Sequence, residues 1–281
     1  MAITTLDGVI AGAKPLATIT KVVSPTLTGL PASGKGYTIW YLAGNPSGSV
    51  ATAIGINGEA VNAATTSATS IQGRIPRTEA ISPAESYVTR FSAISSAVTG
   101  SLWLIDRLWH NSGLSATAVT TQSITAAALP PRDRNGSTNG DGVMAALEWS
   151  VAPGAGTGTS NLTYTDASSA TANATIIGTG AMHAGAFEIF QTAPQPATTG
   201  TGVRTPLSVT HSATRTSGTL HLVLFRPILQ IDLTVANIGN VVDALTSGMP
   251  EIYPYSCLQL VFFPTATTAT TIFAQYVESQ G

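Results

Sequence analysis

The sequence predicts an all-β protein, folded as a β-sandwich or jelly roll with very little helix, and three observations support this. Short runs of β-branched and aromatic residues alternate with turns rich in Gly, Pro, Ser and Asn along almost the whole chain. Hydrophobic residues make up 43% of the 281 residues, which is enough to build a core. Charged residues make up only 9%, where an ordinary soluble domain has about a quarter. The surface is therefore expected to consist of Thr, Ser, Ala and Gly.

The first well-marked pair of strands lies at residues 87–92 and 101–105. Alternation in the first run places Tyr87, Thr89 and Phe91 on one face. A turn at Gly100 precedes the second run, so the pair is predicted to form a hairpin. Further strands are predicted at residues 37–42, 145–151, 161–165, 186–190, 257–263 and 271–277.

The clearest alternation lies at residues 220–226, where both faces of the predicted strand are largely apolar. Such a strand is expected to be covered on both sides. Pro227 is expected to end it, and a second strand resumes over residues 228–235.

Helical signals are few, at residues 4–11 and at residues 240–245. Residues 57–70, 130–142 and 193–203 are predicted loops. The middle loop marks a boundary between two β units, residues 1–130 and 131–281, although a single domain fits as well. The first unit would carry an extended N-terminal arm that ends near Ser24.

The net charge of −2 and the absence of a basic stripe argue against direct nucleic-acid binding. Lysine occurs only at positions 14, 21 and 35. No run approaches the roughly 18 apolar residues of a membrane span. The N-terminus lacks the basic and apolar regions of a signal peptide. We therefore expect no membrane partner, and assembly in a cytoplasm.

Residues 29–36 nearly match a phosphate-binding loop, but Gly36 stands where Ser or Thr should meet magnesium. A strand-like run follows instead of a helix, so a glycine turn is the preferred interpretation.

Residues 133–142 have the character of a calcium loop, in which Asp133, Asn135 and Asp141 could supply oxygen ligands. The EF-hand register fails, because Thr138 replaces the sixth-position glycine and Met144 the twelfth-position glutamate. A turn-rich loop whose Asn-Gly pairs supply positive φ is preferred.

The four histidines, at positions 110, 183, 211 and 221, lie far apart and show no two-ligand spacing. Asp106 and His110 would point the same way along a strand, but no nucleophile elbow accompanies them. We prefer a polar strand end that carries Arg107 and His110 toward a neighbouring protein. Glycosidase chemistry would need Glu148 and Glu188 to be brought together by the fold.

Cys257 is the single cysteine, which excludes an internal disulfide and a multi-cysteine zinc site. It lies in an apolar run and is expected to be a small buried hydrophobe. No catalytic, cofactor-binding or metal-binding residue is therefore predicted, and no cofactor.

In its overall style the chain resembles structural proteins of tailed-bacteriophage virions. The resemblance rests on the opening residues 1–8, on residues 106–113 and 132–142, and on a Thr/Ala/Gly-rich, lysine-poor composition throughout. It implies a capsid decoration (cement) protein or a tail component, located in the virion, and transfers no functional residues. The chain lacks the long helix expected of the common tailed-phage shell protein.

The favoured hypothesis is a non-enzymatic decoration protein that forms a homo-oligomer, with a trimer as one suitable symmetry. Its partners would be the major capsid protein or other virion proteins. The alternative is a glycan- or receptor-binding module of a tail or fibre, in which exposed tryptophans stack on sugars; these are Trp40, Trp103, Trp109 and Trp149. A hydrolase on a β scaffold is the third hypothesis, and it depends on the Asp106/His110 and Glu148/Glu188 pairs.

Overall fold

The computed structural model describes residues 3, 5–23, 35–48, 53–66, 71–79, 84–152, 154, 158–178, 184–191 and 201–281. Within these ranges the chain is almost entirely β, with two short helices, α1 (Leu6–Ala11) and α3 (Ala244–Ser247). The prediction of an all-β protein with very little helix is confirmed. Neither of the described helices is long and apolar enough to span a membrane.

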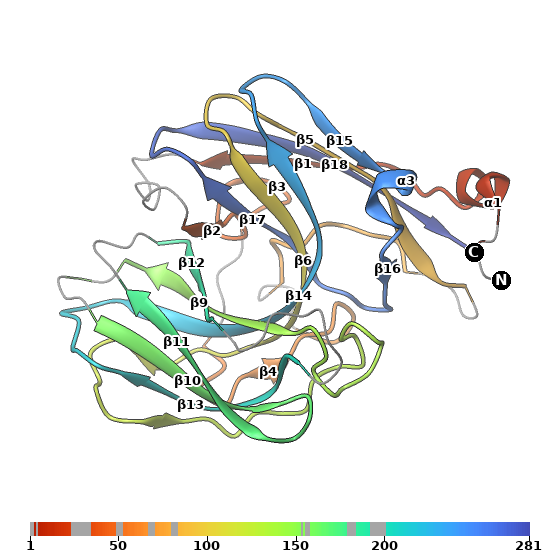
Figure 1. Ribbon diagram of the computed structural model, residues 1–281. Helices are drawn as coiled ribbons and strands as arrows, with labels where there is room; N and C mark the ends of the chain where they lie inside the picture. Colours follow the sequence, from red (N-terminus) through yellow and green to blue (C-terminus); the bar gives the residue numbers. More distant parts are fainter. Residues whose placement is uncertain are drawn as a thin grey trace.

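A closed barrel forms the centre of the molecule (Figure 1). Six strands pair in a ring, because the first and last of them also pair with each other. In ring order they are β6 (Gly100–His110), β17 (Leu258–Pro264), β2 (Gly36–Thr38), β12 (Ala186–Ile189), β9 (Met144–Val151) and β14 (Thr219–Leu233). Two short strands extend this sheet, β4 (Glu59–Ala60) beside β6 and β7 (Leu114–Ser115) beside β14.

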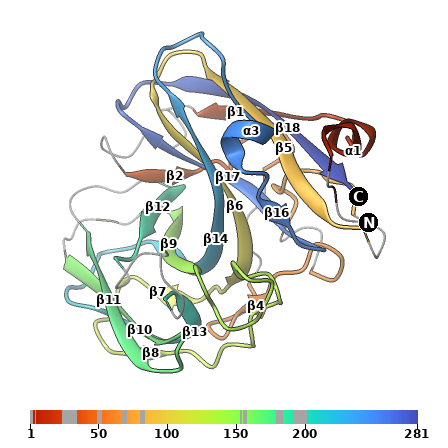
Figure 2. The same cartoon turned by 45° about the vertical axis from the view of Figure 1, so that its right-hand side comes forward.

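Two further sheets lie on either side of the barrel (Figures 1 and 2). The six-stranded sheet runs β15 (Asn240–Asp243), β5 (Ser86–Ser95), β18 (Thr270–Gln280), β1 (Ala17–Val23) and β3 (Gly44–Asn45), with β16 (Glu251–Ile252) also paired to β5. The four-stranded sheet runs β11 (Thr171–Gly178), β10 (Gly158–Asp166), β13 (Val203–His211) and β8 (Gln122–Ser123). All pairings in these sheets are antiparallel.

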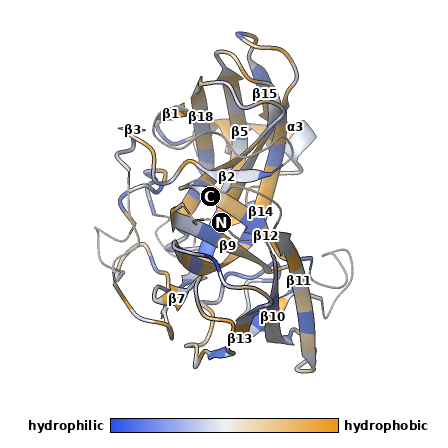
Figure 3. Cartoon of the chain, turned by 90° about the vertical axis from the view of Figure 1, so that its left-hand side faces the viewer, coloured by the Kyte–Doolittle hydropathy of each residue, from blue (hydrophilic) through white to orange (hydrophobic). Residues whose placement is uncertain are grey.

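Three apolar clusters fill the spaces between and within these layers. Phe91 and Ile272 of the six-stranded sheet pack against the outside of the barrel at Leu104. Leu162 of the four-stranded sheet packs against another part of the barrel wall, which includes Leu222. The third cluster lies inside the barrel and consists of Ile105, Met144, Ala146, Phe187, Val223, Phe225 and Val261. In Figure 3, strands with orange, hydrophobic stretches run through the middle of the molecule.

The strand predicted to be covered on both sides is indeed covered on both. In β14, Leu222 and Leu224 face the four-stranded sheet, whereas Val223 and Phe225 face the barrel interior. The predicted break at Pro227 is wrong, because β14 runs through it without interruption. Pro227 lies at a register shift and beyond the last residue paired with β9, so its missing N–H is tolerated there.

The predicted hairpin of residues 87–92 and 101–105 is also wrong. The first run belongs to β5, which pairs with β18, β15 and β16 of the six-stranded sheet. The second belongs to β6 of the barrel, which pairs with β14, β17 and β4. The connection between β5 and β6 therefore passes from the six-stranded sheet to the barrel, and Gly100 is the first residue of the barrel strand.

Local irregularities account for the remaining differences. A register shift opposite Thr89 puts Val88 rather than Thr89 in the core with Phe91. Residues 240–243 form β15, so only the last part of the helix predicted at 240–245 is helical. The strand predicted over residues 37–42 ends at Thr38.

The described part of the N-terminal segment packs against β18 of the same chain. Helix α1 is followed by a hydrogen bond from the Lys14 N–H to the Glu278 carbonyl, and β1 pairs along β18. The barrel takes strands from both sides of residue 130, so residues 1–130 and 131–281 share one closed sheet. The predicted loop at 57–70 includes β4, and residues 193–200 of the third loop lie outside the described residues.

Candidate functional site

Several candidate residues lie together at the polar end of the barrel interior. They form a cluster of buried ionisable side chains. Within β6, the register against β14 shifts between Arg107 and Trp109, which leaves Leu108 without a direct partner. This bulge places the side chains of Arg107 and His110 together, although they are three residues apart. Arg107 lies two residues after Ile105, so its side chain points to the same face of β6, into the barrel interior.

Arg107 is hydrogen-bonded along its whole guanidinium group. Nη2 donates to Glu148 Oε2 at 2.7 Å, and Nη1 donates to Gln259 Oε1 at 3.2 Å. Nε donates to His110 Nδ1 at 2.9 Å. The Tyr41 hydroxyl donates to the same Glu148 oxygen at 3.1 Å. The cluster therefore ties β6, β9 and β17 together inside the barrel.

Burial and charge set the protonation states of this cluster. Burial alone would raise the pKa of Glu148, but the charge and hydrogen bond of Arg107 outweigh it and lower that pKa. Burial, aided by Arg107, lowers the pKa of His110 to about 4, against the opposing effect of Glu59. His110 is then neutral at pH 7, so its Nδ1 accepts from Arg107 and its Nε2 donates to Glu59 at 3.1 Å.

This cluster has no access to a substrate, because Arg107, His110 and Glu148 are completely buried. The expectation that Arg107 and His110 reach toward a neighbouring protein is therefore wrong. Their side chains fill the end of the barrel, and the bulge at Leu108 is the reason. The cluster is suited to holding strands in register rather than to chemistry.

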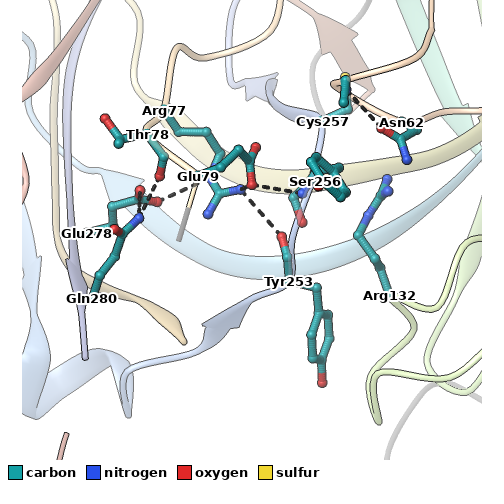
Figure 4. Close-up of polar contacts among 12 residues, drawn as sticks. Asn62, Arg77, Thr78, Glu79, Arg132, Tyr253, Ser256, Cys257, Glu278 and Gln280 are labelled. Atoms are coloured by element: carbon teal, nitrogen blue, oxygen red, sulfur yellow. Dashed lines mark hydrogen bonds and ion pairs between the residues drawn. The ribbon is translucent and has the colours of Figure 1, made fainter. Parts of the chain in front are cut away.

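Asp106 lies on the other face of β6 and has different partners. Its carboxylate accepts from Arg132 Nε at 3.0 Å, from the Ser256 hydroxyl at 2.7 Å and from the Cys257 N–H at 2.8 Å. Arg132 and Ser256 come from the loops beside the barrel (Figure 4). Asp106 and His110 thus share no partner, and they do not form the acid–base pair of a triad.

Glu148 and Glu188 are separated by the sheet itself. Phe187 lies opposite Glu148 and Glu188 lies opposite Leu147, so the two carboxylates project from opposite faces. Glu188 accepts from Trp149 Nε1 at 3.0 Å, and burial raises its pKa. The paired carboxylates that a glycosidase requires are not formed by these two residues.

In the loop at 133–142, the Asp133 carboxylate acts as an internal cap. It accepts from the N–H groups of Asn135, Ser137, Gly140 and Asp141 at 2.7 to 3.1 Å, and from the Ser137 hydroxyl at 2.6 Å. Positive φ angles at Gly136, Gly140 and Gly142 confirm the predicted turn-rich loop. Among the described residues, no group of three or more His, Cys, Asp or Glu side chains is placed to hold a metal ion.

The remaining histidines have structural partners where they are described. His221 Nδ1 lies 2.7 Å from the Asn111 carbonyl, and His211 Nδ1 lies 2.8 Å from the Ser160 hydroxyl. The Ser160–His211 pair joins β10 to β13 and could not be found from sequence, because the two residues are 51 positions apart. His183 lies outside the described residues, as does most of the segment 29–36, although Gly36 begins a strand rather than a helix.

A second ion network, for which the sequence contains no local signal, surrounds the buried Arg77 side chain (Figure 4). Arg77 Nη1 lies 2.7 Å from Glu79 Oε2, and Nε lies 3.2 Å from Glu278 Oε2. The same Glu79 oxygen accepts from the Tyr255 N–H at 2.9 Å. Beside this network is a groove of about 440 Å³ that includes the half-exposed Tyr255 ring.

The tryptophans are mostly inside the protein. Trp40, Trp109 and Trp149 are buried, and Trp103 is half-buried with its ring centre 4.9 Å from that of Phe263. Cys257 is buried as expected, and burial raises the pKa of its thiol to about 12. The three buried tryptophans and the thiol are therefore not presented to solvent as binding or reactive groups.

The distribution of charge is the most informative feature of the exterior. Of the 12 basic and 14 acidic residues, eleven are buried. They are Lys21, Asp106, Arg107, Arg132, Asp133, Asp141, Glu148, Glu188, Arg215, Arg226 and Glu278. The exterior is therefore even poorer in charge than the composition indicates.

One exposed face combines this low charge with large apolar side chains. We call it the outer face: the positions of β15, of β1, of residues 90–95 in β5 and of residues 270–277 in β18 that point away from the barrel. They are Val241, Asp243, Arg90, Ser92, Ile94, Thr271, Phe273, Gln275, Val277, Thr18, Thr20 and Val22. A groove of about 380 Å³ crosses this face between Ile94, Val241 and Phe273. The outer face is the candidate functional surface of the protein.

No protein-family model matches this chain, and no curated protein sequence matches it. The fold defines the chain as an all-β protein in which a central barrel lies between two sheets.

Proposed function

We propose that this chain is a non-enzymatic virion structural protein, and specifically a capsid decoration protein that oligomerises and stabilises the particle. The single observation that carries the proposal is the burial of eleven charged residues in a chain that has only 26. An exterior so poor in charge gives little electrostatic repulsion between copies. It suits a protein that works in a dense, ordered assembly.

The interior networks support a structural role as well. The ion pairs Arg107–Glu148 and Arg132–Asp106 join strands and loops that are far apart in sequence. Of the four candidate residues for hydrolysis, Asp106 and Glu148 are used in these two ion pairs. A barrel whose strands are joined by buried ion pairs and hydrogen bonds gives an assembly protein a fixed shape on which to present its surfaces.

The expected partners follow from this role. Copies of the chain would form a homo-oligomer, for which a trimer is a suitable symmetry, and the oligomer would contact the major capsid protein or other virion proteins. Its location would be the virion, after assembly in the host cytoplasm. The net charge of −2 gives no reason to expect direct nucleic-acid contact.

The alternative, a glycan- or receptor-binding module of a tail or fibre, loses its original support. It relied on exposed tryptophans, and three of the four are buried. Tyr255, beside the groove near Arg77, offers a half-exposed aromatic ring next to polar side chains. The decoration hypothesis is the better supported of the two.

The test is to compare particles made with and without the gene for this chain. Mass spectrometry of purified particles should find the protein in stoichiometric amounts. Particles that lack it should form but should break at a lower temperature or a weaker osmotic shock. A protein absent from particles, or particles equally stable without it, would overturn the proposal. Heads that fail to form would indicate a shell protein, and normal heads without tails would indicate a tail component.

A further inference from the structure

Helix α1 lies against one end of the outward side of the six-stranded sheet, where the Ser279 hydroxyl donates to the Val9 carbonyl, and no described part of the chain covers the outer face beyond it. The opposite face of the same sheet packs on the barrel through Ile19, Phe91 and Ile272. On the outer face, Phe273 and Val241 are 45% and 53% exposed, and Val22 is similarly exposed at the far strand. Leu245, which follows β15 in α3, is 91% exposed. The solvent-facing side of an antiparallel sheet normally carries polar residues. Large exposed apolar side chains on this side therefore indicate a binding surface.

We propose that the outer face is the self-association surface of this protein, and that its occupant is the same face of a second copy. The inference deepens the proposed function and rests on it for the biological setting, because it names the surface through which copies of the virion protein meet.

Charge favours a second copy as the occupant. Among the twelve positions of the outer face, only Arg90 and Asp243 carry charge. They lie directly opposite each other across β5 and β15, so these twelve positions sum to zero charge and contain one group of each sign, whereas Glu85 and Glu251 lie beyond them, beside Tyr87. A surface with one cation and one anion is complementary to itself, because Arg90 of one copy can pair with Asp243 of the other. A partner with a strong charge of either sign would gain nothing here.

The size of the face sets the strength of the contact. Four strands about 4.8 Å apart, each about six residues long at about 3.4 Å per residue, make a face of roughly 400 Å². The exposed side chains of Ile238 and Leu245 extend it. Two copies would bury on the order of 1,000 Å² in total, which is the low end of specific interfaces. The contact is therefore weak between free molecules and becomes strong when many copies are held together on one particle.

Cross-linking tests the geometry directly. The only native cysteine is buried, so a new cysteine on the surface becomes the only accessible thiol in the described part of the chain. Ser92→Cys places a thiol at the centre of the outer face, and Thr163→Cys places a matched one on the outward side of the four-stranded sheet. With a short bismaleimide, we expect a cross-linked dimer for Ser92→Cys at least about tenfold more than for Thr163→Cys. Equal yields for the two variants would overturn the proposal.

Substitution tests the energetics. In sedimentation velocity, Phe273→Lys should raise the dissociation constant of self-association at least about tenfold, because an unpaired ammonium would enter the apolar contact. Val119→Lys is the matched control: Val119 is 48% exposed and lies in the β7–β8 connection, away from the outer face. It should leave association unchanged. Circular dichroism and thermal melts of both variants establish that each is folded.

The outcomes separate this inference from the proposed function. Loss of self-association only in Phe273→Lys supports the second-copy interface, even if the protein is later found outside virions. Normal self-association of Phe273→Lys with lost particle binding would assign the outer face to the capsid shell and overturn the inference, while the decoration role would stand. A wild-type protein that stays monomeric at millimolar concentration, and on particles, would overturn it too.

Discussion

Arg107 and Glu148 form a completely buried ion pair, with Nη2 of the arginine 2.7 Å from Oε2 of the glutamate. The two residues belong to β6 and β9, which flank β14 on either side. Their contact therefore fixes two strands that do not pair with each other. A buried pair of this kind adds little net stability over an apolar pair, but the loss of one partner leaves an isolated charge. The Arg107–Glu148 pair thus fixes the register of the barrel strands.

We predict that Glu148→Ala lowers the free energy of unfolding by about 3–5 kcal/mol, because it leaves the Arg107 guanidinium buried without its counter-charge. Urea denaturation followed by tryptophan fluorescence measures the change. The double substitution Arg107→Met with Glu148→Leu should recover most of the loss, since both charges are then absent. Glu188→Gln is the matched control, because Glu188 is also buried but projects from the opposite face of the sheet, away from Arg107. Equal losses in Glu148→Ala and Glu188→Gln would contradict this account.

A second prediction concerns acid sensitivity. Burial lowers the pKa of His110 to about 4, below its ordinary value of 6.5. The unfolded chain therefore binds a proton between pH 6.5 and 4 that the folded chain does not bind. Stability is fully present above pH 6.5 and is lost as the pH falls toward 4, by roughly 3 kcal/mol from this group. The pKa values of His211 and His221 are also lowered by burial and act in the same direction.

The measurement is the free energy of unfolding in urea at pH 7 and at pH 4.5. His110→Gln keeps a polar side chain near Arg107 and Glu59 but removes the titration, so the drop between the two pH values should shrink. A drop of unchanged size in His110→Gln would mean that the other histidines or the carboxylates account for the acid sensitivity.

Much of the strand content could be predicted from alternation and turn residues, whereas the layer to which each strand belongs could not. The runs that become β9, β10, β17 and β18 are marked by β-branched and aromatic residues. Pairing depends on partners far along the chain: β5 and β6 are neighbours in sequence, yet each pairs mainly with strands more than 100 residues away. The pairing of β6 with β14, which closes the barrel, has no local signal in the sequence of either strand.

The polar residues illustrate the same limit. Regular alternation would put Asp106 and His110 on one face of β6, and a single extra residue at Leu108 separates them. A bulge arises from the register against β14, so it cannot be read from β6 alone. By contrast, the positive φ of the Asn-Gly turns in residues 133–142 is a local property, and it was predictable for that reason.

The Asp133 cap gives a third prediction. Asp133→Ala removes the acceptor for four N–H groups and one hydroxyl, so we expect a loss of about 2–4 kcal/mol in the free energy of unfolding. Asp141→Ala is the control for general damage to the loop. Calcium at millimolar concentration should leave the melting temperature of the wild type unchanged, because the Asp133 oxygens are already occupied by donors. A calcium-dependent rise in melting temperature that Asp133→Ala abolishes would restore the metal-site interpretation.

The last prediction concerns the Cys257 thiol, whose pKa is raised to about 12 by burial, with the Asp106 charge adding to the effect. A thiol with this pKa carries almost no thiolate at pH 8, and the thiolate is the reactive form. The side chain is also completely enclosed, in contact with the apolar group of Trp40, Val61 and Ile71. Reaction with a disulfide reagent such as dithionitrobenzoate therefore requires the protein to open. We expect one thiol to react rapidly in 8 M urea, and to react in native buffer only at the rate of unfolding. Glu148→Ala should accelerate the native reaction in proportion to its loss of stability, whereas a fast reaction in the intact wild type would show that the loops around Cys257 open independently of the barrel.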